Sequence, residues 1–291
     1  MKDTFQFTVH QEGYSVRDFL GKYYKFSFRL LQKLEKEGLV SVNNQQAILH
    51  QKINLHDSIK IDFLDEYEDI PRNQSTLSIL YEDIDLLVID KEPYQVVHPT
   101  KTHIDDTVAN RVAHYFDQIK LKRKVRFINR LDMNTSGVLM IAKNPYVHHI
   151  VSEEMRSNRV EKIYLAVTDQ KPSELSGTID AKIGRVGEDI RHTVNDKGKP
   201  SVTHYQVIDY QSPFSLLKIV LETGRTHQIR VHLSSEGMPI LGDELYGEPS
   251  KLIQRQALHC HRIRVRHPRT SQWLVLESPL PQDIRSIMSM R

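Results

Sequence analysis

The stretch from Phe127 to Lys143, FINRLDMNTSGVLMIAK, joins a polar turn to a run of residues that suits only a buried strand. Its second half, Gly137 to Ala142, is apolar and of strand length, which favours a strand covered on both faces. Its first half holds Arg130 and Asp132. An acid and an arginine beside a buried strand are typical of a site presented by a rigid scaffold, although an ordinary surface ion pair gives the same pattern.

The same turn carries a family signature. Arg-Leu-Asp at 130–132, two further residues and then Thr-Ser-Gly resemble the signature of the RluA/RluD-type pseudouridine synthases. In that family the aspartate is the catalytic residue, which the resemblance assigns to Asp132. The family usually has His before Arg-Leu-Asp, whereas this chain has Asn129. The difference leaves the carboxylate in place but puts the local hydrogen bonding of Arg130 in question.

Length and composition set broad limits. The 291 residues suffice for one large domain and one small domain. The net charge is only +3, so affinity for nucleic acid must come from local clusters of charge. The N-terminus lacks the apolar core of a signal peptide and no window approaches a membrane span, so we expect a cytoplasmic protein with no membrane partner. Cys260 is the only cysteine, which excludes an internal disulfide and every multi-cysteine zinc site.

Residues 14–62 have the pattern of a compact module. Apolar residues at helical spacing predict two helices, the second stopped by Gly38, and short strands then follow around an Asn-Asn turn. The helical part carries a basic stripe: Lys22, Lys25, Arg29, Lys33 and Lys36. Such a stripe is typical of a solvated helix face, and it also suits a phosphate backbone.

The segment FSFRLLQKLEKEGLVSVNN in this module resembles the core of the S4 RNA-binding domain. The resemblance implies that the two-helix face contacts RNA, with Arg29 and Lys33 among the contacts. We therefore expect an S4-like domain at 1–63, a linker at 64–75 and a catalytic domain at 76–291. The linker assignment rests on an acidic, Pro-containing segment without an apolar period.

The first part of the predicted catalytic domain alternates strands and helices. A second buried strand is expected at Leu86–Ile89, a short strand at Val96–Val97, and a helix from Val108 after an aspartate cap at 105–106. A basic segment precedes the central turn: Lys120, Lys122, Arg123, Lys124 and Arg126. Its common meaning is a solvated loop, but next to the Asp132 turn it could form a rim that contacts phosphates.

The segment EKIYLAVT at 161–168 alternates apolar and other residues, as a strand with one packed face does. A tyrosine on a strand is usually structural. In the resembled family, however, a Lys-x-Tyr segment supplies a ring that stacks on the target base, which points to Lys162 and Tyr164. Stacking a base on an aromatic ring is worth roughly 1 to 3 kcal/mol.

Two further segments complete the predicted site. Residues 177–200 predict hairpins with a mobile tip, and SLLKIVLE then predicts a strand. After it, TGRTHQIRVHL predicts a helix capped by Thr226 and ended by Gly237, where exposed backbone amides favour an anion. TGRTHQIRVHL and PILGDELYG also resemble the synthase family. The resemblance implies that Arg230 pairs with the catalytic carboxylate. It also implies that Arg225, His227 and Gln228 line the substrate pocket or bind the RNA.

The sequence as a whole predicts an α+β fold: a mixed, largely antiparallel sheet with flanking helices and a central cleft, plus the small α/β S4-like domain. The predicted activity is isomerisation of uridine to pseudouridine in structured RNA, with ribosomal RNA expected ahead of transfer RNA. This reaction consumes nothing, and no dinucleotide motif, P-loop or His-Glu-x-x-His occurs, so we expect no cofactor and no metal. We also expect the protein to be a monomer. Asp132 could act as nucleophile or as base.

Two other functions compete with this interpretation. A catalytically inactive RNA-binding or ribosome-assembly factor would retain the fold and the basic patches, and Asn129 motivates that alternative. A hydrolytic glycosidase would use Asp132 with a second carboxylate, but none lies in the motif.

Overall fold

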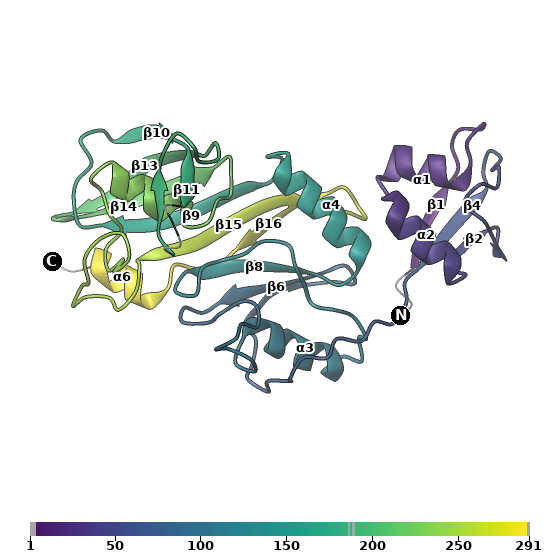
Figure 1. Cartoon of the computed structure of the whole chain (residues 1–291), viewed down its shortest axis with the longest axis horizontal. Helices are drawn as coiled ribbons and strands as arrows, with labels where there is room; N and C mark the ends of the chain where they lie inside the picture. The colour runs from purple at the N-terminus through teal and green to yellow at the C-terminus, as the bar shows by residue number, and fades with distance from the viewer. Residues whose placement is uncertain (1–3, 186, 188–189, 290–291) are drawn as a thin grey trace.

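The computed structural model describes residues 4–185, 187 and 190–289. They form a four-stranded sheet near the N-terminus, a ten-stranded sheet that makes up most of the molecule, and a separate two-stranded hairpin (Figure 1). The described pairs of the large sheet are antiparallel except for one parallel pair. The predicted α+β class, with a mixed and largely antiparallel sheet, is confirmed.

The N-terminal module holds two short helices against the small sheet. Ser15 and Ser27 cap the helices through their side chains, and Gly38, with φ of +68°, follows the second helix as expected. The elements are β1 (Thr4–Thr8), α1 (Val16–Tyr24), α2 (Phe28–Lys36), β2 (Val40–Val42), β3 (Gln45–Gln46) and β4 (Ser58–Asp62). Strand β1, which the sequence did not reveal, pairs with β4 more than 50 residues away.

The large sheet has the strand order β10-β13-β14-β9-β15-β8-β6-β5, with β16 paired to β15 and β7 paired to β8. Its strands are β5 (Ile79–Glu82), β6 (Leu86–Lys91), β7 (Arg126–Phe127), β8 (Ser136–Ala142), β9 (Glu161–Thr168), β10 (Ser176–Asp180), β13 (Val202–Gln211), β14 (Phe214–Leu221), β15 (Leu258–Arg266) and β16 (Trp273–Glu277). The helices α3 (Val108–Gln118), α4 (Pro145–Arg156), α5 (Gln228–Ser235) and α6 (Gln282–Met288) lie around it, and β11 (Ile183–Arg185) pairs with β12 (His192–Val194) in the hairpin.

Strand β8 is the central strand that its sequence predicts, because every one of its residues is buried. It pairs antiparallel with β6 along its length and parallel with β15 at its start. Gly137 makes the parallel contact possible: its φ is +111°, and a Cβ there would lie 2.2 Å from the carbonyl oxygen of Cys260. Gly137 thus allows β15 to lie against the first residues of β8, directly after the Asp132 turn.

Two local expectations were wrong. Val96 and Val97 form no strand; their carbonyls instead accept the amides of Val108 and Ala109 at the start of α3, at 2.9 and 3.0 Å. The cap of α3 is Thr107, which exchanges hydrogen bonds with the side chain and backbone of the residue three positions later, rather than the preceding aspartates. A capping box satisfies two free helix amides at once, which a single aspartate cap does not.

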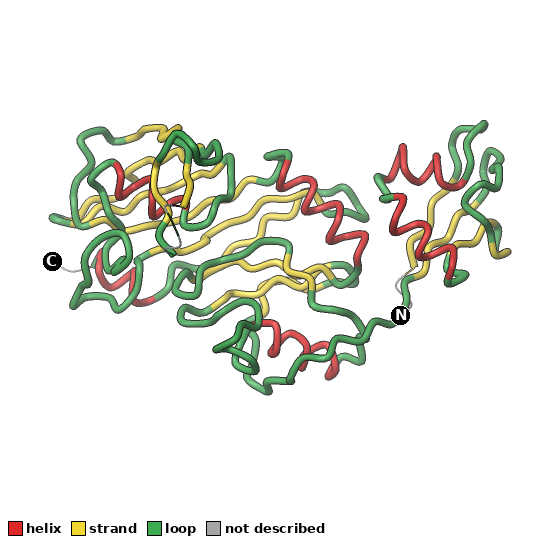
Figure 2. The backbone as a smooth tube through the Cα atoms, viewed as in Figure 1, coloured by secondary structure: helices red, strands yellow, loops and turns green. Residues whose placement is uncertain are grey.

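The segment predicted as a linker, residues 64–75, contains no helix or strand and runs past α3 (Figure 2). Its first half is nevertheless bonded to the basic segment before the Asp132 turn. Glu66 pairs with Arg126 at 2.6 Å, the Glu68 carboxylate accepts the Val125 amide at 2.7 Å, and Asp65 pairs with Lys122 at 3.5 Å. Much of the predicted phosphate-contacting rim is therefore matched by acids of the same chain.

The N-terminal module also contacts helix α4 and the loop between β15 and β16. The Tyr146 ring on α4 stacks on Phe26 with centroids 4.0 Å apart, and its hydroxyl donates to the Tyr24 carbonyl at 2.9 Å. The Arg269 guanidinium lies 3.6 Å from the centre of the Phe5 ring. Within the described ranges no helix has the length and apolarity to cross a lipid bilayer.

Candidate functional site

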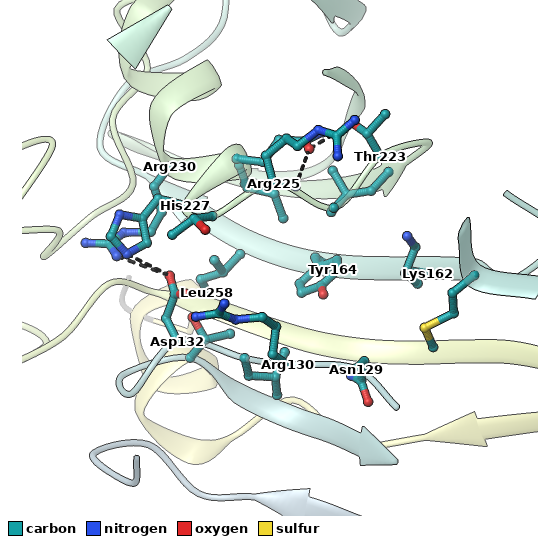
Figure 3. A pocket seen from close by; sticks show the side chains of 18 of the residues that line it. Asn129, Arg130, Asp132, Lys162, Tyr164, Thr223, Arg225, His227, Arg230 and Leu258 are labelled. Carbon is teal, nitrogen blue, oxygen red and sulfur yellow. Dashed lines mark hydrogen bonds and ion pairs between the residues drawn. The ribbon is translucent and has the colours of Figure 1, made fainter. Parts of the chain in front are cut away.

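A pocket of about 510 Å³ opens beside the Asp132 turn. In Figure 3 strand β9 crosses its middle with Lys162 and Tyr164, the turn with Asn129, Arg130 and Asp132 lies on one side, and the start of α5 lies on the other. Eight of the predicted site residues line it: Arg130, Asp132, Lys162, Tyr164, Arg225, His227, Gln228 and Arg230. Asp132 and Arg230, which are 98 residues apart in the chain, thus meet at one site.

Asp132 lies on a turn whose carbonyls are held by two buried cations. The Thr135 amide donates to the Asp132 carbonyl at 3.0 Å. Lys91 donates to the Met133 carbonyl at 2.9 Å, and Arg255 donates to the Asn134 carbonyl at 3.1 Å. Burial, together with the nearby charge of Arg255, lowers the pKa of Lys91 to about 7, against a smaller opposing effect of Asp132. The backbone of the turn is therefore held in place by buried side chains, while the Asp132 carboxylate faces the pocket.

Asn129, where the resembled family usually has His, bonds the central strand. Its side-chain amide donates to the Val138 carbonyl at 3.0 Å, and its side-chain oxygen accepts the Met140 amide at 2.8 Å. The side chain thus continues the pairing of β7 with β8 beyond the point where the backbone turns away.

Arg130 is exposed and has no hydrogen-bond or ion-pair partner among the described residues, so its guanidinium is available at the pocket rim.

Lys162 and Tyr164 project from the same face of β9. Burial, together with the neighbouring buried Cys260 thiol, raises the pKa of Tyr164 well above its usual value, so the phenol stays protonated. Burial also lowers the pKa of Lys162, which has no ion-pair partner in the described part of the chain. The middle of the pocket therefore offers an aromatic ring beside an ammonium group without a counterion.

The helix α5 begins differently from the expectation. Its N-cap is His227, whose backbone is left-handed with φ of 56°, and Thr226 makes no cap hydrogen bond. The preceding turn is held instead by Gln228, whose side-chain oxygen accepts from the Thr223 hydroxyl at 2.8 Å and from the Arg225 amide at 3.0 Å. The left-handed residue turns the His227 ring toward Asp132, which a regular cap would not do.

Arg230 meets the Asp132 carboxylate as predicted, with Nη1 donating to Oδ2 at 3.2 Å. The guanidinium is buried and makes two further bonds of 2.7 Å to Asp243, a residue the sequence did not single out. Burial opposes its charge, but the hydrogen bonds and charges of Asp243 and Asp132 outweigh burial and raise the pKa of Arg230. A Gly-Asp pair within PILGDELYG was the available signal for Asp243.

His227 lies near the same carboxylate, with Nε2 3.9 Å from Asp132 Oδ2. Its Nδ1 is 2.9 Å from the Tyr246 hydroxyl, which accepts the backbone amide of His192 at 2.8 Å. The hydroxyl proton is then free to go to Nδ1, which assigns the imidazole proton to Nε2, on the side of Asp132. Burial lowers the pKa of His227, so the ring is neutral at pH 7.

The two remaining predicted contacts, Arg29 and Lys33, lie on the exposed side of α2 in the N-terminal module and do not line this pocket. Lys33 lies 3.8 Å from Glu66. The predicted mobile tip of 177–200 falls partly on residues 186, 188 and 189, outside the described residues. Over the described ranges, no group of three or more His, Cys, Asp or Glu is placed to hold a metal ion.

Comparison with known proteins gives matches of one kind. A family model described as RNA pseudouridylate synthase matches residues 85–235. The Bacillus subtilis (strain 168) protein named uncharacterized RNA pseudouridine synthase YlyB is 38% identical over 265 residues, covering 89% of this chain and 87% of that one. Ribosomal large subunit pseudouridine synthase D of Nitrosomonas europaea is 36% identical over 275 residues, covering 89% and 78%.

A solved structure, human RNA Pseudouridylate Synthase Domain Containing 1, is 30% identical with a TM-score of 0.59. The match covers 72% of this chain and 85% of the human one. A second human structure, RNA Pseudouridylate Synthase Domain Containing 4, is 25% identical with a TM-score of 0.57 and covers 72% and 90%.

Proposed function

The chain belongs to the RNA pseudouridylate synthase family, and on that premise we propose that Asp132 is the residue that carries out its isomerisation of uridine. The reaction breaks the bond between the ribose C1′ and the uracil N1, turns the base, and joins C5 to C1′. The C5 proton is lost and a proton returns to N1, so the atoms balance without a co-reactant. The observation that supports Asp132 is its carboxylate, held 3.2 Å from Arg230 at the wall of a pocket with a tyrosine ring.

Two routes are open to the carboxylate, and both act on the ribose. As a nucleophile, Asp132 would attack C1′ and expel the uracil, which then returns through C5. As a base, it would remove the 2′ proton and so help the bond from C1′ to the base to break. In either route the carboxylate must be ionised and aimed, and the Nη1 hydrogen bond of Arg230 favours both conditions.

The nucleotide must leave the RNA stack before its ribose can reach Asp132. We assign Tyr164 to the extruded uracil, because it lines the pocket on the strand that crosses its middle and burial keeps its phenol neutral. The unpaired cations Lys162 and Arg130 suit the flanking phosphates, which are the usual partners of basic side chains in RNA complexes. Arg225, exposed at the turn before α5, would extend this basic rim.

Ribosomal RNA is the substrate class that we favour, with transfer RNA as the alternative. Two of the similar proteins, from Nitrosomonas europaea and Pseudomonas aeruginosa, are named ribosomal large subunit pseudouridine synthase D. We further propose that residues 1–63 form an S4-like RNA-binding domain, joined by residues 64–75 to a catalytic domain at 76–291. Arg29 and Lys33 on the exposed side of α2 would then contact the same RNA.

Pseudouridine maps of total RNA test this assignment. Three strains are compared: one lacking the protein, one complemented with the wild-type chain, and one complemented with Asp132→Asn. We expect a site in ribosomal RNA to lose pseudouridine in the first strain, to regain it in the second and to stay unmodified in the third. Restoration by Asp132→Asn would overturn the role of Asp132, and a site confined to transfer RNA would overturn the substrate class.

A further inference from the structure

The Arg230 guanidinium has two edges, and one of them is fully used by Asp243. Nε donates to Asp243 Oδ2 and Nη2 donates to Asp243 Oδ1, both at 2.7 Å. Only Nη1 reaches the Asp132 carboxylate, at the longer distance of 3.2 Å. Arg230 therefore makes its short, two-point bond to Asp243, which does not line the pocket. It makes only a longer, one-point bond to Asp132, which does line the pocket.

Asp243 is itself held rigidly. Its side chain is completely buried, and its Oδ1 also accepts the amides of Leu245 and Tyr246 at 3.1 and 3.2 Å. The turn that carries it depends on Gly242, whose φ is +73° and whose Cβ would lie 2.5 Å from a carbonyl oxygen of Arg255. The Tyr246 ring covers the guanidinium from the side, 5.0 Å from its centre. The Arg230 guanidinium is thus held by Asp243 along one edge and by the Tyr246 ring on one face.

We propose that Asp243 is a positioning residue that restricts Arg230 to a single hydrogen bond with Asp132. Two carboxylates share one guanidinium, so the group keeps a net charge of −1 and Asp132 is not neutralised by a two-point ion pair of its own. The Asp132 oxygen that Arg230 does not reach stays available to the ribose. This inference rests on the proposed role of Asp132.

The Asp243 carboxylate accepts from four donors: two on Arg230 and the amides of Leu245 and Tyr246. The side-chain amide of Asp243→Asn has only one acceptor oxygen, so Arg230 is held less firmly. The released guanidinium can turn its free edge toward Asp132 and make the two-point bond, which favours the ionised but less reactive carboxylate. The single-turnover rate constant should fall about tenfold, the effect of one added charge-assisted hydrogen bond. The acidic limb of the pH–rate profile should move to lower pH, and RNA affinity should stay within about twofold.

Asp85→Asn is the matched control for loss of a buried pair. Asp85 is completely buried and binds Arg269 with the same two-point geometry, at 2.7 and 2.8 Å, and neither residue lines the pocket. Both variants should lose stability in thermal unfolding, but Asp85→Asn should keep the wild-type pH–rate profile. The other titratable groups coupled to Asp132 are His227, Lys91, Tyr164 and Tyr246, and both variants retain them.

The experiment measures single-turnover pseudouridine formation across pH for the wild type, Asp243→Asn, Asp85→Asn and Asp132→Asn, at a temperature where all are folded. A slower rate with a shifted acidic limb in Asp243→Asn alone supports the inference. A wild-type profile in Asp243→Asn, or the same change in Asp85→Asn, overturns it. Activity in Asp132→Asn would instead refute the proposed function, which distinguishes the two failures.

Discussion

At the scale of single residues, the Tyr164 ring is the surface on which we expect the extruded uracil to lie. The residue lines the pocket on the strand that crosses its middle, and burial keeps its phenol protonated. Tyr164→Phe keeps the ring and should stay within a few-fold of the wild-type kcat/KM. Tyr164→Leu removes stacking worth roughly 1 to 3 kcal/mol, which corresponds to a loss of about 5- to 150-fold.

Steady-state kinetics on the modified RNA checks this difference, with thermal unfolding as the control for folding. Equal losses in the Phe and Leu variants would show that the hydroxyl, and not the ring, carries the role of Tyr164.

The individual site residues were predictable to different degrees. Asp132 and Arg230 could be predicted because each lies in a long motif, and the structure brings them together. Asp243 was missed because its importance comes from a contact with Arg230, and its only local signal was its place within PILGDELYG. Asn129 departs from the family motif, yet it replaces backbone pairing along β8 with side-chain bonds to Val138 and Met140.

At the scale of elements, the contact between β8 and β15 depends on Gly137. Alanine there would be strained at φ of +111° and would place its Cβ 2.2 Å from the Cys260 carbonyl oxygen. Gly137→Ala should lower the free energy of unfolding by on the order of 3 kcal/mol or more. Gly13→Ala is the matched control, because Gly13 also has a positive φ, +90°, but its Cβ would meet nothing within 4 Å.

Urea unfolding compares the two variants, and the control should lose only about 1 kcal/mol from backbone strain. Similar losses in both would mean that the close approach of the strands contributes nothing beyond the cost of the dihedral angle.

Strong hydrophobic patterns identified elements well, whereas weak local signals did not. The buried runs of β6 and β8 lie where their sequences place them, because burial on both faces allows only apolar residues. The short strand predicted at Val96–Val97 was wrong, since those carbonyls bond the start of α3. Likewise Thr226 resembles an N-cap in sequence, but His227 occupies that position because its left-handed backbone starts α5.

At the scale of the whole molecule, buried histidines link stability to pH. His259 joins β8 to the segment after β16 through Ser136 and Ser278, and burial lowers its pKa to about 4. Below about pH 6.5 the unfolded chain binds a proton that the folded chain does not, so stability falls as the pH drops toward 4. Above that window the histidine is neutral in both states and has no effect.

His259→Gln removes the titratable imidazole while retaining a polar side chain. Between pH 7 and pH 4 the wild type should lose about 3 kcal/mol more of its unfolding free energy than the variant loses. Urea unfolding at a series of pH values measures the difference. Parallel curves for the two proteins would contradict a lowered pKa at His259.

The arrangement of the segments relative to one another was the least predictable feature. The basic segment at 120–126 suggested a rim for phosphates, but acids of residues 64–75 pair with it, a contact between regions some 60 residues apart. The packing of Tyr146 against Phe26 similarly joins two regions that each looked self-contained in sequence. Such contacts depend on surfaces that exist only after each part has folded.

We propose above all that Asp132, held by Arg230, performs the isomerisation in this pocket. The most direct test is release of tritium from RNA labelled at uracil C5, measured with Asp132→Asn alongside its RNA affinity and thermal unfolding. We expect a folded protein that binds RNA within a few-fold of the wild type and releases no tritium above background. Tritium release by Asp132→Asn at a rate near that of the wild type would contradict it.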